Sequence, residues 1–86
     1  MQVPEIAGSQ IRAARGALGW SVQELAGRTG VGTATIVRYE TADAVPPSRK
    51  GNLQTIIHTF EAAGIEFIGT PDDGPGIRMR KPSSRT

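Results

Sequence analysis

Few side chains in this sequence could carry catalysis or hold a metal ion. There is no cysteine and His58 is the single histidine, so neither a thiolate cluster nor a histidine pair can form. Asp72 and Asp73 are adjacent carboxylates, but they lie among glycines and prolines, where Asp is a common turn residue. The Gly-Val-Gly segment at 30–32 lacks the preceding strand and the third glycine of a dinucleotide-binding fingerprint. We therefore expect no enzyme activity, no metal and no cofactor.

Arginine is the residue type here that would bind phosphate or a base edge. The net charge is only +2, so charge alone does not identify a nucleic-acid-binding protein. Arg12 and Arg15 flank the apolar face of the first expected helix. Arg78 and Arg80 alternate with apolar residues, which predicts a strand with one basic face. These four arginines are candidate phosphate contacts, with an ordinary solvent-facing role as the alternative.

The composition fits one small folded domain. The chain has 86 residues, 37% of them apolar and 21% charged. Its lack of cysteine rules out disulfides, which favours the cytoplasm as its compartment. No apolar run reaches the length of a membrane span, and the first five residues lack the basic start of a signal peptide. We expect no membrane association.

The clearest structural signal is the Ser-x-x-Glu pattern at 21–24, a capping box. In this pattern Ser21 caps a backbone amide at the start of a helix, and Glu24 reaches back to the chain before it. The helix is short and ends at position 27 or at Gly30, since glycine readily takes the left-handed conformation that closes a helix. A second short helix is predicted from about 33 to 41, with Ile36 and Tyr39 on one face. Two short helices joined by a glycine-containing turn predict a helix-turn-helix over 22–40.

Two longer helices are expected on either side of this motif. The first runs from about 6 to 18, with Ile11, Ala14 and Leu18 on one face. The second follows a loop at 43–51 that contains two prolines, has Asn52 as its N-cap and ends before Gly64. Its apolar residues fall at i, i+3, i+4 and i+7, the strongest amphipathic pattern in the chain: Leu53, Ile56, Ile57 and Phe60.

After Gly64 the hydrophobic period changes from helical to alternating. The runs at 65–68 and 77–80 alternate, and the segment between them, 69–76, is dense in turn-forming residues. This predicts a β-hairpin with a longish loop, followed by a loose tail at 82–86. The hairpin either covers the helices as a lid or pairs across a two-fold axis with a second copy, presenting Arg78 and Arg80 to phosphate.

The motif resembles the lambda-repressor-like (Cro/Xre type) helix-turn-helix family. The small, glycine, apolar and isoleucine positions of that family's twenty-residue pattern match Ala26, Gly30, Val31 and Ile36. The flanking segments 18–21 and 38–40 also look like those of the family, and the resemblance covers about 11–63. It implies a mainly α fold of four to five helices, here followed by a short C-terminal β-hairpin. The packing anchors it implies are Leu25, Val31, Ile36 and Tyr39.

The resemblance also implies which residues touch DNA. The family commonly reads bases from the first turn of the second motif helix and again one turn later. The family's phosphate-clamping glutamine corresponds here to Val22, with Gln23 one residue later. The candidate DNA-binding residues are Gln23, Gly32, Thr33, Ala34, Thr35, Val37 and Arg38.

The sequence therefore predicts a DNA-binding domain over 1–64, a hairpin over 65–81 that could dimerise, and a tail over 82–86. The expected function is sequence-specific binding of double-stranded DNA by a small transcriptional regulator, a homodimer with helix 33–41 in the major groove. The alternative is a module that keeps the fold but binds another regulatory protein instead of DNA. The small and apolar outer face of that helix motivates this alternative.

Overall fold

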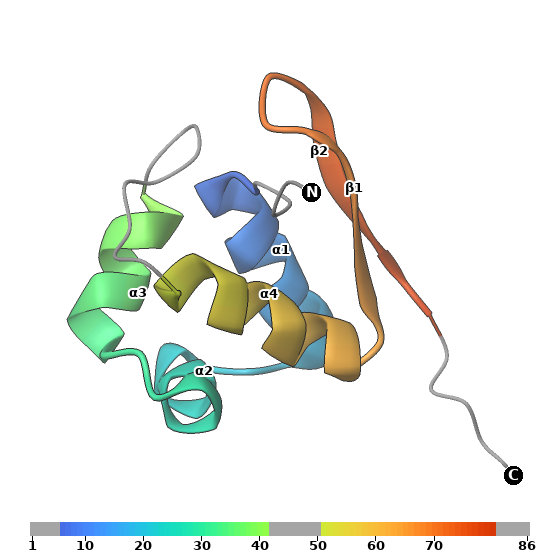
Figure 1. Ribbon diagram of the computed structural model, residues 1–86. Helices are drawn as coiled ribbons and strands as arrows, with labels where there is room; N and C mark the ends of the chain where they lie inside the picture. The colour runs from blue at the N-terminus through green and yellow to red at the C-terminus, as the bar shows by residue number, and fades with distance from the viewer. Residues whose placement is uncertain (1–5, 42–50, 81–86) are drawn as a thin grey trace, which may run out of the picture.

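The computed structural model describes residues 6–41 and 51–80, which form four helices and one antiparallel hairpin (Figure 1). The mainly α fold class with a C-terminal hairpin is confirmed, and the described residues contain four of the expected four to five helices. The tail expected at 82–86 and nearly all of the loop expected at 43–51 lie outside these residues. The elements are α1 (Gly8–Leu18), α2 (Val22–Thr29), α3 (Thr33–Glu40), α4 (Asn52–Ala62), β1 (Ile65–Thr70) and β2 (Asp73–Met79).

Local signals set both ends of α2. The Ser21 hydroxyl oxygen accepts a hydrogen bond from the Glu24 amide at 3.0 Å, as the capping pattern predicts. The returning half of the capping box was wrongly predicted, because the Glu24 carboxylate accepts instead from Arg28 Nε at 2.7 Å. At the other end Gly30 has φ 79° and donates its N–H to the Ala26 carbonyl, which closes the helix as expected.

The start of α4 differs from the prediction. Gly51, not Asn52, is the N-cap, and Asn52 is the first residue of the helix. The Asn52 side chain donates to the hydroxyl of Tyr39 in α3 at 3.4 Å, and therefore does not cap its own helix. The other boundaries shift slightly: α1 begins at Gly8 after an extended Ala7, and α3 ends at Glu40.

One apolar core joins all four helices and the start of β1. Its largest members are fully buried and come from every helix. Trp20 extends this core in the turn between α1 and α2, where its ring stacks on Phe60 of α4 with 5.6 Å between centroids. Phe67 of β1 also contacts Phe60, in an edge-to-face arrangement with 6.0 Å between ring centroids. The buried side chains are Ile6, Ile11, Ala14, Leu25, Val31, Ile36, Tyr39, Ile56, Ile57, Phe60 and Ile65.

The hairpin is longer than the sequence predicts. β1 and β2 extend through most of the expected loop at 69–76, so only two residues, Pro71 and Asp72, separate the strands. The register shifts between Ile68 and Thr70, where Gly69 adopts φ 74°. A Cβ at Gly69 would lie 2.1 Å from the Gly74 carbonyl oxygen, so only glycine allows this approach.

Gln10 of α1 holds the hairpin to the helices. Its side chain is buried, its Nε2 donates to the Ile68 and Gly76 carbonyls at 3.1 and 2.9 Å, and its Oε1 accepts from the Ala7 amide. One side chain therefore satisfies three backbone groups, one in the residue before α1, one in β1 and one in β2. Figure 1 shows the hairpin and α3 on opposite sides of α1 and α4.

Candidate nucleic-acid interface

The packing of α2 against α3 orients the second helix. The four expected anchors, Leu25, Val31, Ile36 and Tyr39, are all buried in the core, and Ala26 lies half-buried beside it. Ile36 and Tyr39 are one turn apart, so the opposite face of α3 points away from the core. The predicted helix-turn-helix geometry is therefore present, with one face of α3 available to a ligand.

The available face of α3 carries three of the candidate DNA-binding residues, Ala34, Val37 and Arg38. Ala34, Val37, Arg38 and Thr41 follow one another at i, i+3, i+4 and i+7, and all four are exposed. Gln23 is exposed in the first turn of α2, while Thr35 is half-buried. The structure thus brings together a set of short side chains and one long cation, in the order Gly32, Thr33, Ala34, Val37 and Arg38.

Gly32 is the N-cap of α3, although the fold does not require a glycine at this position. Its backbone is extended, with φ −66°, and a Cβ built on it would meet no other atom within 4 Å. No side chain caps the amides of the first turn of α3. The missing side chain therefore leaves room for a ligand to approach the backbone closely.

Among the arginines that the structure describes, Arg38 alone has no hydrogen-bond or ion-pair partner. It is exposed at the last turn of α3. The remaining arginines each contact a glutamate: Arg12 and Arg15 contact Glu40, Arg28 contacts Glu24, and Arg78 and Arg80 contact Glu66. Arg38 is thus the cation best placed to contact a phosphate or a guanine.

Arg15 forms a nearly buried ion pair with Glu40 at the end of α3. Its Nε and Nη2 donate to the two carboxylate oxygens at 2.8 and 3.0 Å, and its Nη1 donates to the Trp20 carbonyl. The hydrogen bond and charge of Glu40 raise the pKa of Arg15 above its usual value, against the opposing effect of burial. Arg12 donates to the Glu40 carbonyl from one turn earlier. Both arginines therefore position α3 against α1, a role that the sequence did not suggest.

Glu40 has a structural role at the end of α3 that the sequence did not predict. It is only 5% exposed, which is unusual for a glutamate. A signal was available: Glu40 lies four residues after Ile36 and follows Tyr39, so it falls on the apolar face of its helix. An acidic residue on such a face needs a cationic partner there, but the sequence does not show which arginine supplies it.

Arg78 lies in β2 and Arg80 directly follows Met79, the last residue of β2, and Figure 1 shows that the hairpin lies away from α3. Glu66 of β1 accepts from Arg78 Nη1 at 3.4 Å and from Arg80 Nε at 3.2 Å. These pairs are exposed and therefore weak. The structure does not bring the two hairpin arginines together with the exposed face of α3.

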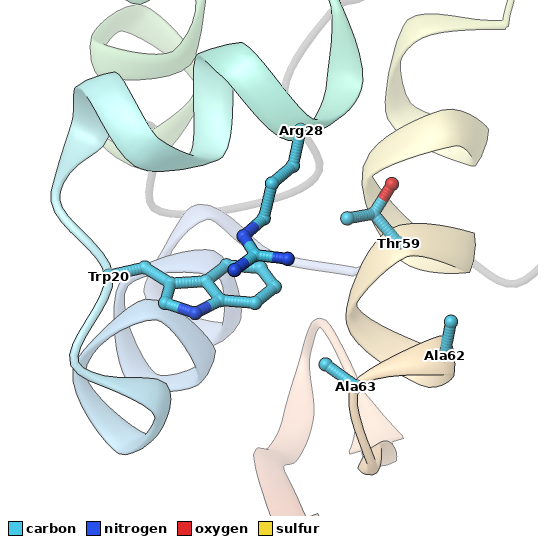
Figure 2. A pocket seen from close by; sticks show the side chains of 5 residues that line it. All are labelled: Trp20, Arg28, Thr59, Ala62 and Ala63. Atoms are coloured by element: carbon cyan, nitrogen blue, oxygen red, sulfur yellow. The ribbon is translucent and has the colours of Figure 1, made fainter.

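A surface hollow of about 360 Å³ lies between α2 and the end of α4 (Figure 2). The guanidinium of Arg28 lies 4.2 Å from the centre of the Trp20 ring and covers the indole. Thr59, Ala62 and Ala63 complete the lining from α4. Within residues 6–41 and 51–80 no three metal-ligating side chains cluster, and this hollow holds no acid–base pair.

Comparison with protein families identifies the class. Residues 6–54, more than half of the chain, match the family model described as a helix-turn-helix domain. The chain therefore belongs to the helix-turn-helix domain family, which is consistent with the resemblance to the Cro/Xre type. A search of curated proteins finds no match. The helix-turn-helix domain indicates DNA binding by a regulator.

None of the helices that the structure describes combines the length and the apolar character that crossing a bilayer requires.

Proposed function

We propose that this protein binds double-stranded DNA sequence-specifically as a small transcriptional regulator, with α3 in the major groove. The observation that carries the proposal is Arg38, exposed on the outward face of α3 and without a partner among the described residues. A major groove about 12 Å wide admits an α-helix, and a helix there meets base edges with its outer face. Thr33 contributes a hydroxyl that can bond a base edge or a phosphate.

The backbone phosphates would be contacted from the ends of the motif. Gln23 is exposed in the first turn of α2, and the first turn of α3 has no side-chain cap. Arg12 is exposed but donates to the end of α3, and Arg15 is committed to Glu40. Gln23 therefore stands ahead of these two arginines as a phosphate contact, and Arg15 acts through the position of α3.

The test compares Arg38→Ala with a matched control, Arg28→Ala, after selecting a bound sequence from a random duplex pool. Both residues are exposed arginines in the motif, but Arg28 pairs with Glu24 and lies over Trp20. Arg38→Ala should weaken specific binding about 5- to 150-fold, the range of a lost bidentate base contact. Arg28→Ala should leave affinity nearly unchanged. Equal affinity of Arg38→Ala and the parent protein on the selected site would refute the placement of α3.

The active form is proposed to be a homodimer in the cytoplasm. Two copies related by a two-fold axis would present two α3 helices to successive turns of one face of the DNA. The hairpin is the element available for pairing, because an isolated two-stranded sheet still has open edges. Its packing on α1 and α4 and the pairing of its arginines with Glu66 favour the role of a lid over that of a phosphate contact.

A second candidate function is binding to another regulatory protein in place of DNA. It is favoured by the exposed Val37 and by the small residues Gly32 and Ala34 on the same helix face. A random DNA pool that yields no enriched sequence, together with a stable complex with a regulator that Val37→Asp disrupts, would support it. An enriched DNA sequence that is lost in Arg38→Ala would reject it.

A further inference from the structure

Val37 is an exposed apolar side chain on the outward face of α3. In residues 6–41 and 51–80 it is one of only two large hydrophobic residues that are exposed, at 48% of its surface, the other being Met79 of β2. Ala34 lies one turn before Val37 on the same face, and Arg38 follows Val37 directly. Apolar and cationic groups are therefore adjacent on the face of α3 that we propose contacts DNA.

The fold itself gives no reason for valine at this position. Ile36 and Tyr39 already fill the core side of α3, and Val37 faces solvent. A β-branched side chain is also a poorer helix former than alanine, leucine or lysine, because the helix restricts its rotamers. A ligand that offers apolar surface would explain the residue type better than helix stability does.

The size of the patch indicates the kind of ligand. A stable protein interface buries roughly 800 Å² on each partner. The apolar surface here is far smaller than that, because it consists of one valine and one alanine, preceded by a glycine and a threonine. One methyl group is the natural match, and among the four base pairs only those with thymine present a methyl group, at C5, in the major groove.

We propose that Ala34 and Val37 form a thymine-reading surface, which packs on the 5-methyl group of a thymine in each half-site. This inference rests on the proposed function, since it requires α3 to lie in the major groove. It adds a specificity determinant made of shape and apolar contact, beside the polar contacts of Arg38 and Thr33. Alanine and valine are short, so α3 must lie close to the base edges for these side chains to contact the methyl group. Gly32, which has no side chain, leaves room for that approach.

The experiment removes the methyl group and nothing else. Each thymine of the selected site is replaced in turn by deoxyuridine, and affinity is measured with the whole 86-residue chain. One position in each half-site should lose about fourfold in affinity, the equivalent of about 0.8 kcal/mol for one methyl-sized group. Cytosine there should bind weakly, and 5-methylcytosine should recover part of the loss.

The protein side of the test is Val37→Ala, with Met79→Ala as the matched control. The ratio of thymine to deoxyuridine affinities should fall towards one in Val37→Ala and stay near four in Met79→Ala, whatever either change does to stability. A selected site at which every deoxyuridine replacement is silent, or a ratio unaffected by Val37→Ala, would overturn the inference and leave the proposed function standing. A pool that yields no selected site would overturn both.

Discussion

At the scale of single residues, the same side-chain type has different roles according to its partner. Arg15 and Arg28 each pair with a glutamate, but Glu40 is 7% exposed in its side chain and Glu24 is 48% exposed. A charge left unpaired in the interior is costly, whereas a surface pair contributes about 0–1 kcal/mol. The position of a glutamate on its helix therefore decides whether the arginine beside it is structural or dispensable.

The first prediction concerns this contrast. Arg15→Met should lower the free energy of unfolding by about 3 kcal/mol, because it leaves the Glu40 carboxylate buried without its cation. The double change Arg15→Met with Glu40→Leu should recover much of that loss. The surface change Glu24→Gln should cost less than about 0.5 kcal/mol. Urea unfolding measures all three, and an Arg15→Met cost as small as that of Glu24→Gln would contradict the role assigned to the pair.

At the scale of elements, Gln10 is the connection between α1 and the hairpin. It bonds the Ala7 amide and the carbonyls of Ile68 and Gly76. A hairpin of two strands is marginal alone, so its order depends on such contacts and on Phe67 packing against Phe60. The hairpin should therefore lose its structure before the helices do when this connection is removed.

The second prediction is that Gln10→Met destabilises the protein by about 2–3 kcal/mol, since buried backbone groups lose their partners. Amide hydrogen exchange should accelerate most in β1 and β2 and least in α3. Gln54→Met is the matched control, because Gln54 is exposed on α4 and should change stability by less than about 0.5 kcal/mol. Uniform acceleration across all elements would show that the hairpin is not separately anchored.

How far the sequence predicted these elements depends on how local their causes are. The ends of α2 could be predicted, because Ser21 and Gly30 act within one turn of the chain. Asn52 was misread as a cap, because its actual partner, Tyr39, belongs to another helix. The loop of the hairpin was predicted too long, because the tight approach of Gly69 to Gly74 depends on strand pairing rather than on composition.

In the candidate site too, features with local causes could be predicted, and contacts between distant segments could not. Its exposed face could be predicted from the alternation of buried Ile36 and Tyr39 with Val37 and Arg38. The arginines of α1 could not be assigned, since Arg15 and Glu40 are 25 residues apart and meet only after α1 and α3 have packed. Contacts of this kind decide which cations remain for DNA, and they follow from tertiary structure alone.

At the scale of the whole molecule, the third prediction concerns symmetry. A homodimer should select a near-palindromic site with half-site centres about 34 Å apart, one turn of DNA. Inserting five base pairs between the half-sites turns them to opposite faces of the duplex and should remove tight binding, while ten should restore part of it. Analytical ultracentrifugation should find two chains per site. One chain on an asymmetric site that tolerates the five-pair insertion would contradict the dimer.

The most direct test of the central claim is to map the DNA contact surface by NMR. The amide signals of the ¹⁵N-labelled 86-residue chain are followed while its selected duplex is added. The largest changes should fall on Gly32 and the first six residues of α3, residues 32–38, with a second set around Gln23, and β2 should change little. Changes centred on the hairpin, with the signals of Gly32, Thr33 and Arg38 unmoved, would contradict the account.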